Sequence, residues 1–100
     1  MKTINTTLPF KLTAYIPVVR FAQLKRYGNL DWPLGYTLVE GVGYWKGEAE
    51  TVEIMTCYFE DYESASAFED DLTDALLVLG EEAVLTDLEA RFGAMLAVRA

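Results

Sequence analysis

Histidine is absent from this 100-residue sequence, and cysteine occurs only once, as Cys57. Without histidine there is no Ser-His or Cys-His nucleophile pair and no His-ligated metal site. One cysteine forms neither an internal disulfide nor a CxxC site, which favours a reducing cytosol, a cytoplasmic protein and a buried structural thiol. The sequence also lacks a Gly-rich phosphate loop. We therefore expect a protein that is not an enzyme and that holds no metal and no cofactor.

Long apolar runs are also missing. No stretch approaches the roughly 18 consecutive apolar residues that a membrane-spanning helix requires. Residues 1–7 carry one charge and no apolar core region, so we expect no secretory signal. The hydrophobic content of 52% nevertheless supports a packed core and argues against disorder. The sequence predicts one folded domain, residues 1–100, that makes no contact with a membrane.

Positive charge is missing from one long stretch, because no Lys or Arg occurs between Glu48 and Glu89. Residues 1–47 hold six basic and two acidic side chains, whereas residues 48–100 hold two basic and fourteen acidic ones. The formal net charge is −8. Such a chain is a poor candidate for direct binding to nucleic acid through phosphates. Its charge asymmetry instead favours a protein partner with a basic surface.

A β-hairpin is predicted over residues 35–59. Two runs rich in β-branched and aromatic residues flank a short polar break, residues 46–50, which predicts a loop of three to five residues in which Gly47 can adopt a positive φ. We expect these two strands to be the central strands of a small sheet.

The two strands of this hairpin are apolar on both faces, although a half-exposed antiparallel strand should be polar on one face. Either residues 20–34 cover the second face, or another molecule does. The second alternative is a homodimer whose self-association surface contains three residues: Trp45, Met55 and Phe59.

Alternating apolar residues predict a further strand over residues 8–19. Because Pro9 and Pro17 lack amide donors, this strand should lie at an edge or pair on one side only at those positions. Residues 20–35 read as a connection, with a short helical turn that ends at Gly28. A long amphipathic helix is predicted at about residues 62–79, with apolar side chains at three- and four-residue steps.

The ends of that helix carry their own signals. Asp61 or Ser64 can cap its N-terminus, and Gly80 stops it. Residues 81–100 fit two interpretations. They form either two strands, 83–88 and 94–98, paired across a loop at 91–93, or a helix with a capping box at 86–89. We favour the strands, because Gly93 would weaken a helix interior.

Together these elements predict an α+β fold. It is a small antiparallel sheet of three to five strands with the long helix packed on one face, ferredoxin-like in outline.

Acidic residues cluster before and along the predicted helix. The early acids suit the positive helix N-terminus, but Asp70, Asp71 and Asp74 lie too far along the helix for that effect, so helix stability alone would not select them. Three interpretations stay open: a solvated face, a hard-cation site or a binding surface. A helix spreads its carboxylates apart, whereas Ca²⁺ requires converging oxygens, so we expect no metal. The partner-binding surface would contain seven residues: Glu60, Asp61, Glu63, Glu69, Asp70, Asp71 and Asp74.

Two short motifs resemble those of small phage-encoded proteins, which carry a G-x-W/Y-x-G-x-x-E turn and a later G-x-E-A-V-L element. Trp45, Gly47 and Glu50 match the turn, with Gly43 at its head, and residues 82–84 match the second element. The likeness covers residues 43–50 and the segments after them. Most such proteins have no assigned activity, so the resemblance implies a phage accessory role and no particular chemistry.

These observations lead to one expected function and to alternatives. We expect a non-enzymatic accessory protein whose acidic surface engages and inhibits a basic nucleic-acid-handling or defence complex, as an anti-CRISPR-like protein or DNA mimic would. The first alternative is a sheet-mediated homodimer that serves in assembly and inhibits nothing. An enzyme would have to use carboxylates, tyrosines or lysines for acid–base chemistry, and the candidates that could line a dimer cleft are Glu40, Tyr44, Glu53 and Tyr58.

Overall fold

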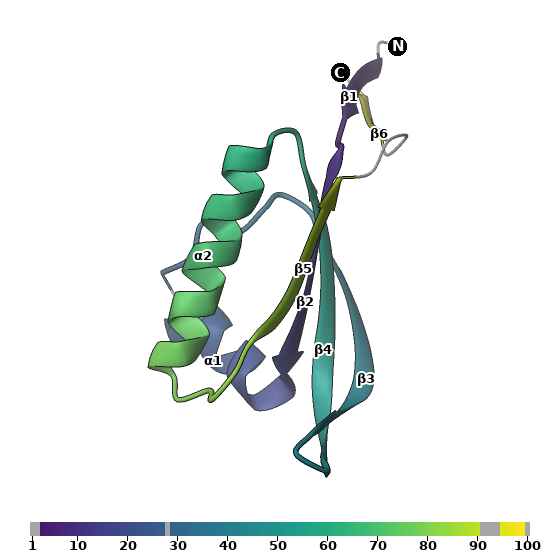
Figure 1. Cartoon of the computed structure of the whole chain (residues 1–100). Coiled ribbons are helices and arrows are strands. Elements are labelled where there is room, and N and C mark those ends of the chain that lie inside the picture. Colours follow the sequence, from purple (N-terminus) through teal and green to yellow (C-terminus); the bar gives the residue numbers. More distant parts are fainter. Residues whose placement is uncertain (1–2, 28, 91–94, 100) are drawn as a thin grey trace.

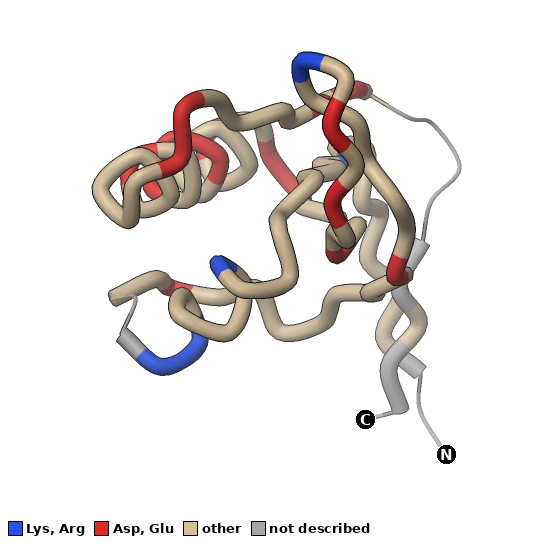
Figure 2. Tube along the Cα trace, turned by 90° about the horizontal axis from the view of Figure 1, so that it is seen from below, with Lys and Arg blue, Asp and Glu red and all other residues tan. Residues whose placement is uncertain are grey.

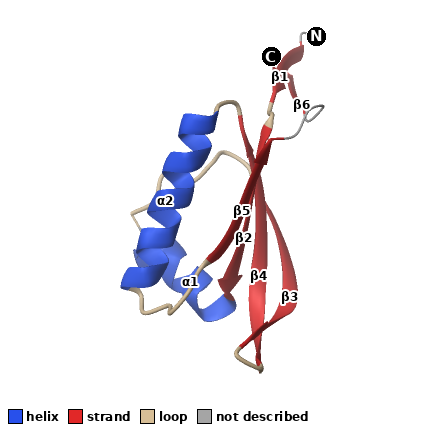
Figure 3. Cartoon of the chain, in the orientation of Figure 1, coloured by secondary structure: helices blue, strands red, loops and turns tan. Residues whose placement is uncertain are grey.

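A computed structural model describes residues 3–27, 29–90 and 95–99 of the chain. Six strands and two helices follow one another in these residues (Figure 3). In chain order they are β1 (Thr3–Thr7), β2 (Phe10–Pro17), α1 (Val18–Tyr27), β3 (Thr37–Trp45), β4 (Glu48–Phe59), α2 (Tyr62–Val78), β5 (Leu85–Ala90) and β6 (Met95–Arg99).

Four of the strands form one antiparallel sheet in the order β3-β4-β2-β5. β2 pairs with β4 along its whole length, so that Leu12 lies opposite Cys57 and Ala14 opposite Met55. β1 and β6 form a separate two-stranded ribbon that extends from one end of the sheet (Figure 1). The α+β class and the antiparallel sheet predicted from the sequence are therefore confirmed.

Both helices lie on the same face of the sheet (Figure 1). The residues between them and the sheet are fully buried, among them Leu12 and Ile16 from β2, Leu24 from α1 and Leu72 from α2. These side chains alternate along the strands and recur at helical spacing along α1 and α2, as a shared core requires. We call this the helix face of the sheet, and the opposite one the open face.

The ends of α2 follow from three residues. Asp61 is the N-cap, and its carboxylate accepts a hydrogen bond from the Ser64 amide at 2.7 Å. At the other end Gly80 has φ 107°, and the amides of Gly80 and Glu81 donate back to the carbonyls of the last turn. This is the Schellman arrangement, which favours glycine because its backbone has a positive φ. Both caps agree with the prediction.

The β3–β4 connection is a two-residue turn, shorter than the predicted three- to five-residue loop, and in it Lys46 has φ 50° and Gly47 φ 82°. Two positive φ values define the turn type whose twist matches that of a hairpin. The predicted hairpin is present, but its predicted place is wrong. β4 is an inner strand, whereas β3 is an outer strand, because β2 takes the other side of β4.

The strand predicted near residues 8–19 is β2, and it is not an edge strand. The other prediction, that the strand pairs on one side only at its prolines, is confirmed at Pro17. Pro17 pairs with Val52 of β4, whereas the pairing with β5 stops at Tyr15. The connection after β2 is a ten-residue helix, α1, rather than a short helical turn. Gly28, the predicted end of that turn, lies outside the described residues.

Residues 20–34 do not cover the second face of the hairpin. Phe21, Leu30 and Trp32 pack against the same core as α2, on the helix face. Two helices therefore cover that face, where the sequence predicted one. The open face stays without such a cover among the residues that the structure describes.

The tail forms strands, as favoured, but the predicted pairing between them is wrong. β5 pairs with β2, and β6 pairs with β1. The expected loop at 91–93 lies outside the described residues. Between Phe10 and Ala90 the order is β-α-β-β-α-β, the order of a split βαβ unit. The ferredoxin-like outline stays a prediction.

Candidate protein-binding surfaces

The outward side of α2 carries four exposed carboxylates: Glu63, Asp70, Asp71 and Asp74. Ala65, Phe68, Leu72 and Leu76 point into the core, and the helical period therefore turns these four acids toward solvent. None of the four forms an ion pair with any described residue. We call this set the α2 acidic face.

The other three predicted acids do not belong to that face. Glu60 and Asp61 lie before the helix, and the Asp61 carboxylate is engaged by its hydrogen bond from Ser64. The hydrogen bonds from the Ser64 backbone and side chain hold the pKa of Asp61 below its ordinary value. Glu69 turns toward β5 and accepts a hydrogen bond from the Thr86 hydroxyl at 2.9 Å. The structure thus divides the seven predicted residues into four that share a face and three that do not.

Exposed apolar side chains lie at both ends of the α2 acidic face. Tyr62 is exposed at the first turn, and Leu77 and Val78 are exposed at the last, with Val78 86% exposed. Apolar contact and charge therefore occur together on the outer side of α2, the combination that a protein partner can use.

The basic side chains lie elsewhere, and several are already engaged within the chain. The Arg20 guanidinium pairs with the Glu81 carboxylate at 3.1 Å, which ties α1 to the segment after α2. Lys25 donates a hydrogen bond to the Tyr36 hydroxyl at 2.7 Å and lies over the Trp32 ring. Figure 2 shows acidic positions along α2 and basic ones on other segments, so the charge asymmetry of the sequence becomes an asymmetry in space.

The three residues predicted for self-association are not brought together. Met55 is fully buried on the helix face, and Phe59 is partly buried against Phe68 there. Met55 is therefore not placed to contact a second molecule, which corrects the prediction for that residue, whereas Phe59 lines the groove beside the end of β4. Only Trp45 is exposed, by 50%. Most of the large apolar residues exposed on the hairpin are on β3: Leu38, Val39, Val42, Tyr44 and Trp45, with Tyr58 on β4.

Trp45 also anchors the hairpin tip to the segment before β5. Its indole N–H donates to one oxygen of Glu82 at 3.1 Å, and Lys46 Nζ lies 2.6 Å from the other oxygen. The bonds from Lys46 and, second, from Trp45 hold the pKa of Glu82 below its ordinary value. The two segments that carried the phage resemblance, residues 43–50 and 82–84, are therefore in contact.

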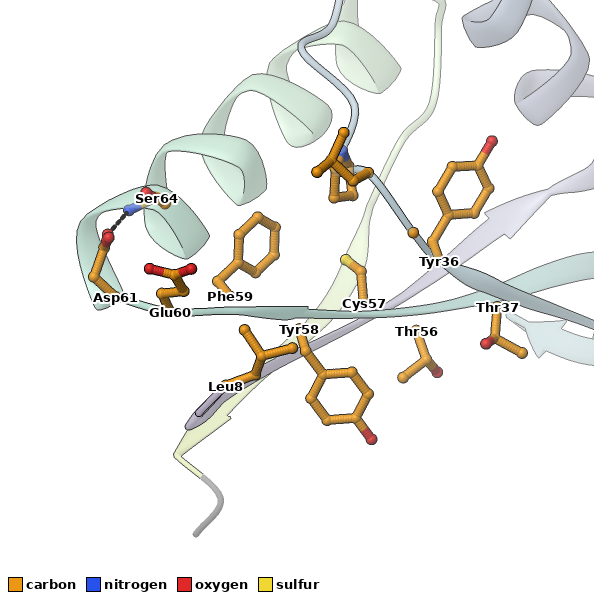
Figure 4. A pocket seen from close by; sticks show the side chains of 13 residues that line it. Leu8, Tyr36, Thr37, Thr56, Cys57, Tyr58, Phe59, Glu60, Asp61 and Ser64 are labelled. Atoms are coloured by element: carbon orange, nitrogen blue, oxygen red, sulfur yellow. Dashed lines mark hydrogen bonds between the residues drawn. The ribbon is translucent and has the colours of Figure 1, made fainter. Parts of the chain in front are cut away.

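A groove of about 640 Å³ lies at the opposite end of the sheet, beside the last residues of β4 (Figure 4). Phe59 and Cys57 point to one side of β4 there, and Tyr58 and Thr56 to the other. Burial raises the pKa of the Cys57 thiol to about 11, so this thiol is protonated at neutral pH. Among the described residues, the carboxylates that line the groove are Glu60 and Asp61, and the Asp61 carboxylate caps α2.

The chemistry that the described residues offer is limited. No cluster of three or more metal-ligating side chains occurs among them. Of the four residues named for a catalytic cleft in a dimer, Glu40, Tyr44 and Glu53 lie on the helix face, and Glu40 is directly opposite Glu53. Tyr58 lies on the open face of β4. A cleft between two copies stays a prediction.

Comparisons with known proteins assign this chain to no family. No family model, curated protein or solved structure matches this chain. No helix in residues 3–27, 29–90 or 95–99 has the length and apolar character to cross a membrane.

Two features escaped the sequence reasoning. One is the pair of hydrogen bonds from Trp45 and Lys46 to Glu82. Trp45 is 37 positions and Lys46 is 36 positions before Glu82 in the sequence. The other is the free outer edge of β3. The second had a signal in the sequence, because residues 37–45 contain several apolar side chains on both faces and one charge, Glu40. Nothing in the sequence indicated that β2 would displace β3 from the centre of the sheet.

Proposed function

We propose that this protein is a non-enzymatic binding protein whose α2 acidic face engages a basic groove on a nucleic-acid-handling protein. In this proposal it inhibits that protein by occupying the groove in place of nucleic acid. The observation that supports the proposal is the set of four exposed carboxylates on one side of α2, without an ion pair among the described residues.

The charges on α2 have the same sign as those of a nucleic-acid strand but a wider spacing. Glu63 and Asp74 are eleven positions apart, about 16 Å at the rise of an α-helix. The four carboxylates over that length are about 5.5 Å apart on average along the helix axis, against about 3.4 Å per phosphate along one strand of DNA. A groove that neutralises phosphates with Lys and Arg would meet a row of negative charges on α2, at a lower density than on DNA.

Stability within the fold gives no competing reason for these acids. Asp70 and Asp74 are four positions apart on one helix, where like charges repel. Asp70, Asp71 and Asp74 also lie past the first turn, beyond the favourable effect of the helix N-terminus. A partner of opposite charge accounts for their presence, and electrostatic steering would speed its association.

The test is a binding assay with purified nucleic-acid-binding proteins that have basic grooves, with duplex DNA as competitor. The triple variant Asp70→Lys/Asp71→Lys/Asp74→Lys should lose binding, and wild-type binding should weaken as salt rises. A matched control, Glu48→Lys/Glu50→Lys/Asp87→Lys, changes the net charge equally at exposed positions of the sheet. The proposal fails if the control loses binding as fully as the α2 variant, or if DNA does not compete.

The phage origin and the anti-defence role suggested by the resemblance belong to the same proposal. They predict that the groove in question is found on a bacterial defence complex. Inhibition of such a complex by wild-type protein, and not by the α2 variant, would support this part separately.

A further inference from the structure

The outer edge of β3 is the longest unpaired strand edge of the four-stranded sheet. β3 has nine residues, Thr37–Trp45, and among the described residues no strand pairs with its outer side. Its free amides and carbonyls form a template for another strand. Natural edge strands are usually protected by Lys, Pro, bulges or short length. β3 has no Pro, Lys or Arg, and its one charge is Glu40.

The other outer strand, β5, is protected in the expected way. It has six residues and carries Asp87 and Glu89 on the open face, as its pairing with Thr13 and Lys11 of β2 shows. Charges on a short strand discourage pairing with another sheet. The lack of protection is therefore specific to β3.

The hairpin turn determines which backbone groups of β3 are free. In a two-residue hairpin the residues beside the turn, here Trp45 and Glu48, form a hydrogen-bonded pair. Hydrogen-bonded and non-hydrogen-bonded pairs alternate along an antiparallel ladder. Val39, Gly41 and Gly43 therefore direct their amides toward β4, while Leu38, Glu40, Val42 and Tyr44 direct theirs outward.

We infer that β3 pairs antiparallel with β3 of a second copy of this chain, about a two-fold axis at Gly41, which joins the two sheets. Gly41 is the middle residue of β3, so this register overlaps all nine residues. It also places outward-directed residues opposite one another, as hydrogen bonding requires. Leu38 then faces Tyr44 of the second copy, and Glu40 faces Val42 of the second copy.

Charge and side-chain volume favour this register over its neighbours. A two-fold axis at Glu40 would place the two Glu40 carboxylates directly opposite, which is destabilising. An axis at Val42 would leave Leu38 facing the turn residue Lys46. With the axis at Gly41, Val39 of one copy lies opposite Gly43 of the other, where no side chain competes for space. The edge is thus complementary to itself, which selects a second copy as the partner.

Burial supports the same pairing. Val42 is 65% and Tyr44 75% exposed, although both lie on the helix face, because α1 and α2 do not extend over β3. In the dimer, Tyr44 packs beside Leu38 of the second copy, and each Val42 beside Glu40. Leu38 and Tyr44 of each copy thereby gain an apolar cross-strand neighbour that their own chain does not supply.

Sedimentation equilibrium over a wide concentration range tests the pairing. Wild-type protein should dimerise, and more strongly as salt rises, because each copy has a net charge of −8 and salt screens their repulsion. Binding through the α2 acidic face should weaken with salt instead, so failure of one proposal is distinguishable from failure of the other. A monomer at every concentration and salt would overturn the pairing.

Val42→Pro is the sharpest variant. Its missing amide is one that points outward, so the monomer loses no ladder hydrogen bond. The dimer loses that bond twice by symmetry, which should raise its dissociation constant about 30-fold. Val42→Thr keeps the amide and should dimerise, as should Leu85→Lys on β5. A dimer that survives Val42→Pro unchanged, or that Leu85→Lys abolishes, would contradict pairing through β3.

Hydrogen exchange of the wild-type protein gives a readout that needs no variant. At low concentration the inward-directed amides of β3, among them those of Val39, Gly41 and Gly43, should be protected, and the outward-directed ones should exchange. At high concentration the amides of Leu38, Glu40, Val42 and Tyr44 should become protected as well. Concentration-dependent protection at positions outside β3, without this alternation, would overturn the inference.

Discussion

β2 and β3 flank the same strand, β4, on its two sides, yet they occupy opposite environments. β2 sends Leu12, Ala14 and Ile16 under two helices, and all three are fully buried. β3 sends Leu38, Val42 and Tyr44 to the same face of the sheet, beyond the reach of those helices. Hydrophobic strands therefore do not all serve the core of their own chain. The apolar residues of β2 stabilise the fold, whereas those of β3 are available to another molecule.

The most direct way to sharpen this comparison is a matched pair of substitutions, Leu12→Ala and Leu38→Ala. Leu12 is 0% exposed, so its truncation should leave a cavity and lower the free energy of unfolding by about 2–5 kcal/mol. Leu38 is 38% exposed at the uncovered edge, and its truncation should cost the monomer less than about 1 kcal/mol. Urea unfolding at low concentration measures both. Equal losses would show that β3 belongs to the core after all.

The sequence predicted β2 and the helix α2 that covers it. Alternating apolar side chains indicated the strand, and the three- and four-residue spacing from Ala65 to Leu76 indicated the helix above it. Asp61 and Gly80 indicated its ends within one residue or two. All these signals are local, because each depends on neighbours within a turn or a strand.

Strand order was not readable in the same way. The paired residues of β2 and β4 are 35 to 49 positions apart in the sequence, and nothing local distinguishes that partner from β3 or β5. The prolines of the 8–19 segment even argued for an edge, although Pro17 lies past the end of the β5 pairing. Since the sequence did not predict which strand is outermost, Met55 and Phe59 were assigned to a surface while they belong to the helix face. The acidic residues were located in advance, but only the helix geometry separates Glu69 from the α2 acidic face.

A second test loosens the helix that covers β2. Gly80→Ala forces a residue with a side chain to adopt φ 107°, with its Cβ 3.3 Å from Arg20 Nη2. We expect the free energy of unfolding to fall by about 1–2 kcal/mol. Gly35→Ala is the matched control, because its φ is ordinary and no atom lies within 4 Å of the added Cβ. Thermal unfolding of both variants measures the effect. A Gly80→Ala protein with the Tm of the wild type would contradict the role of Gly80 in capping α2.

A third test concerns the other end of the same helix. Asp61→Ala removes the acceptor for the Ser64 amide and should lower the Tm at neutral pH. The folded-state pKa of Asp61 is depressed, so its carboxylate stabilises the fold above the ordinary value of 3.8. That contribution is lost as the pH falls through the folded-state pKa. The Tm difference between wild type and Asp61→Ala should therefore shrink on acidification.

Asp61→Asn is the control for this titration. Its side-chain oxygen still caps the helix, but it carries no charge to lose. The Tm of Asp61→Asn relative to Asp61→Ala should stay constant over the same acidic range. A constant difference for wild type as well would mean that the charge of Asp61 plays no part.

The smallest effect on stability is expected at the hydrogen bonds that join Trp45 and Lys46, at the tip of the β3–β4 hairpin, to Glu82. Glu82 is exposed, so Glu82→Gln should leave the Tm nearly unchanged. The carboxylate has a depressed pKa, and its bonds to Lys46 and Trp45 are present above about 4.5 and lost as the pH falls through the folded-state pKa. The indole N–H resonance of Trp45 should follow this titration in wild type and not in Glu82→Gln. Trp32, which packs against the core, supplies the internal control. If the indole resonance of Trp32 shifted in parallel with that of Trp45, the whole fold, rather than the β3–β4 hairpin alone, would be responding to acid.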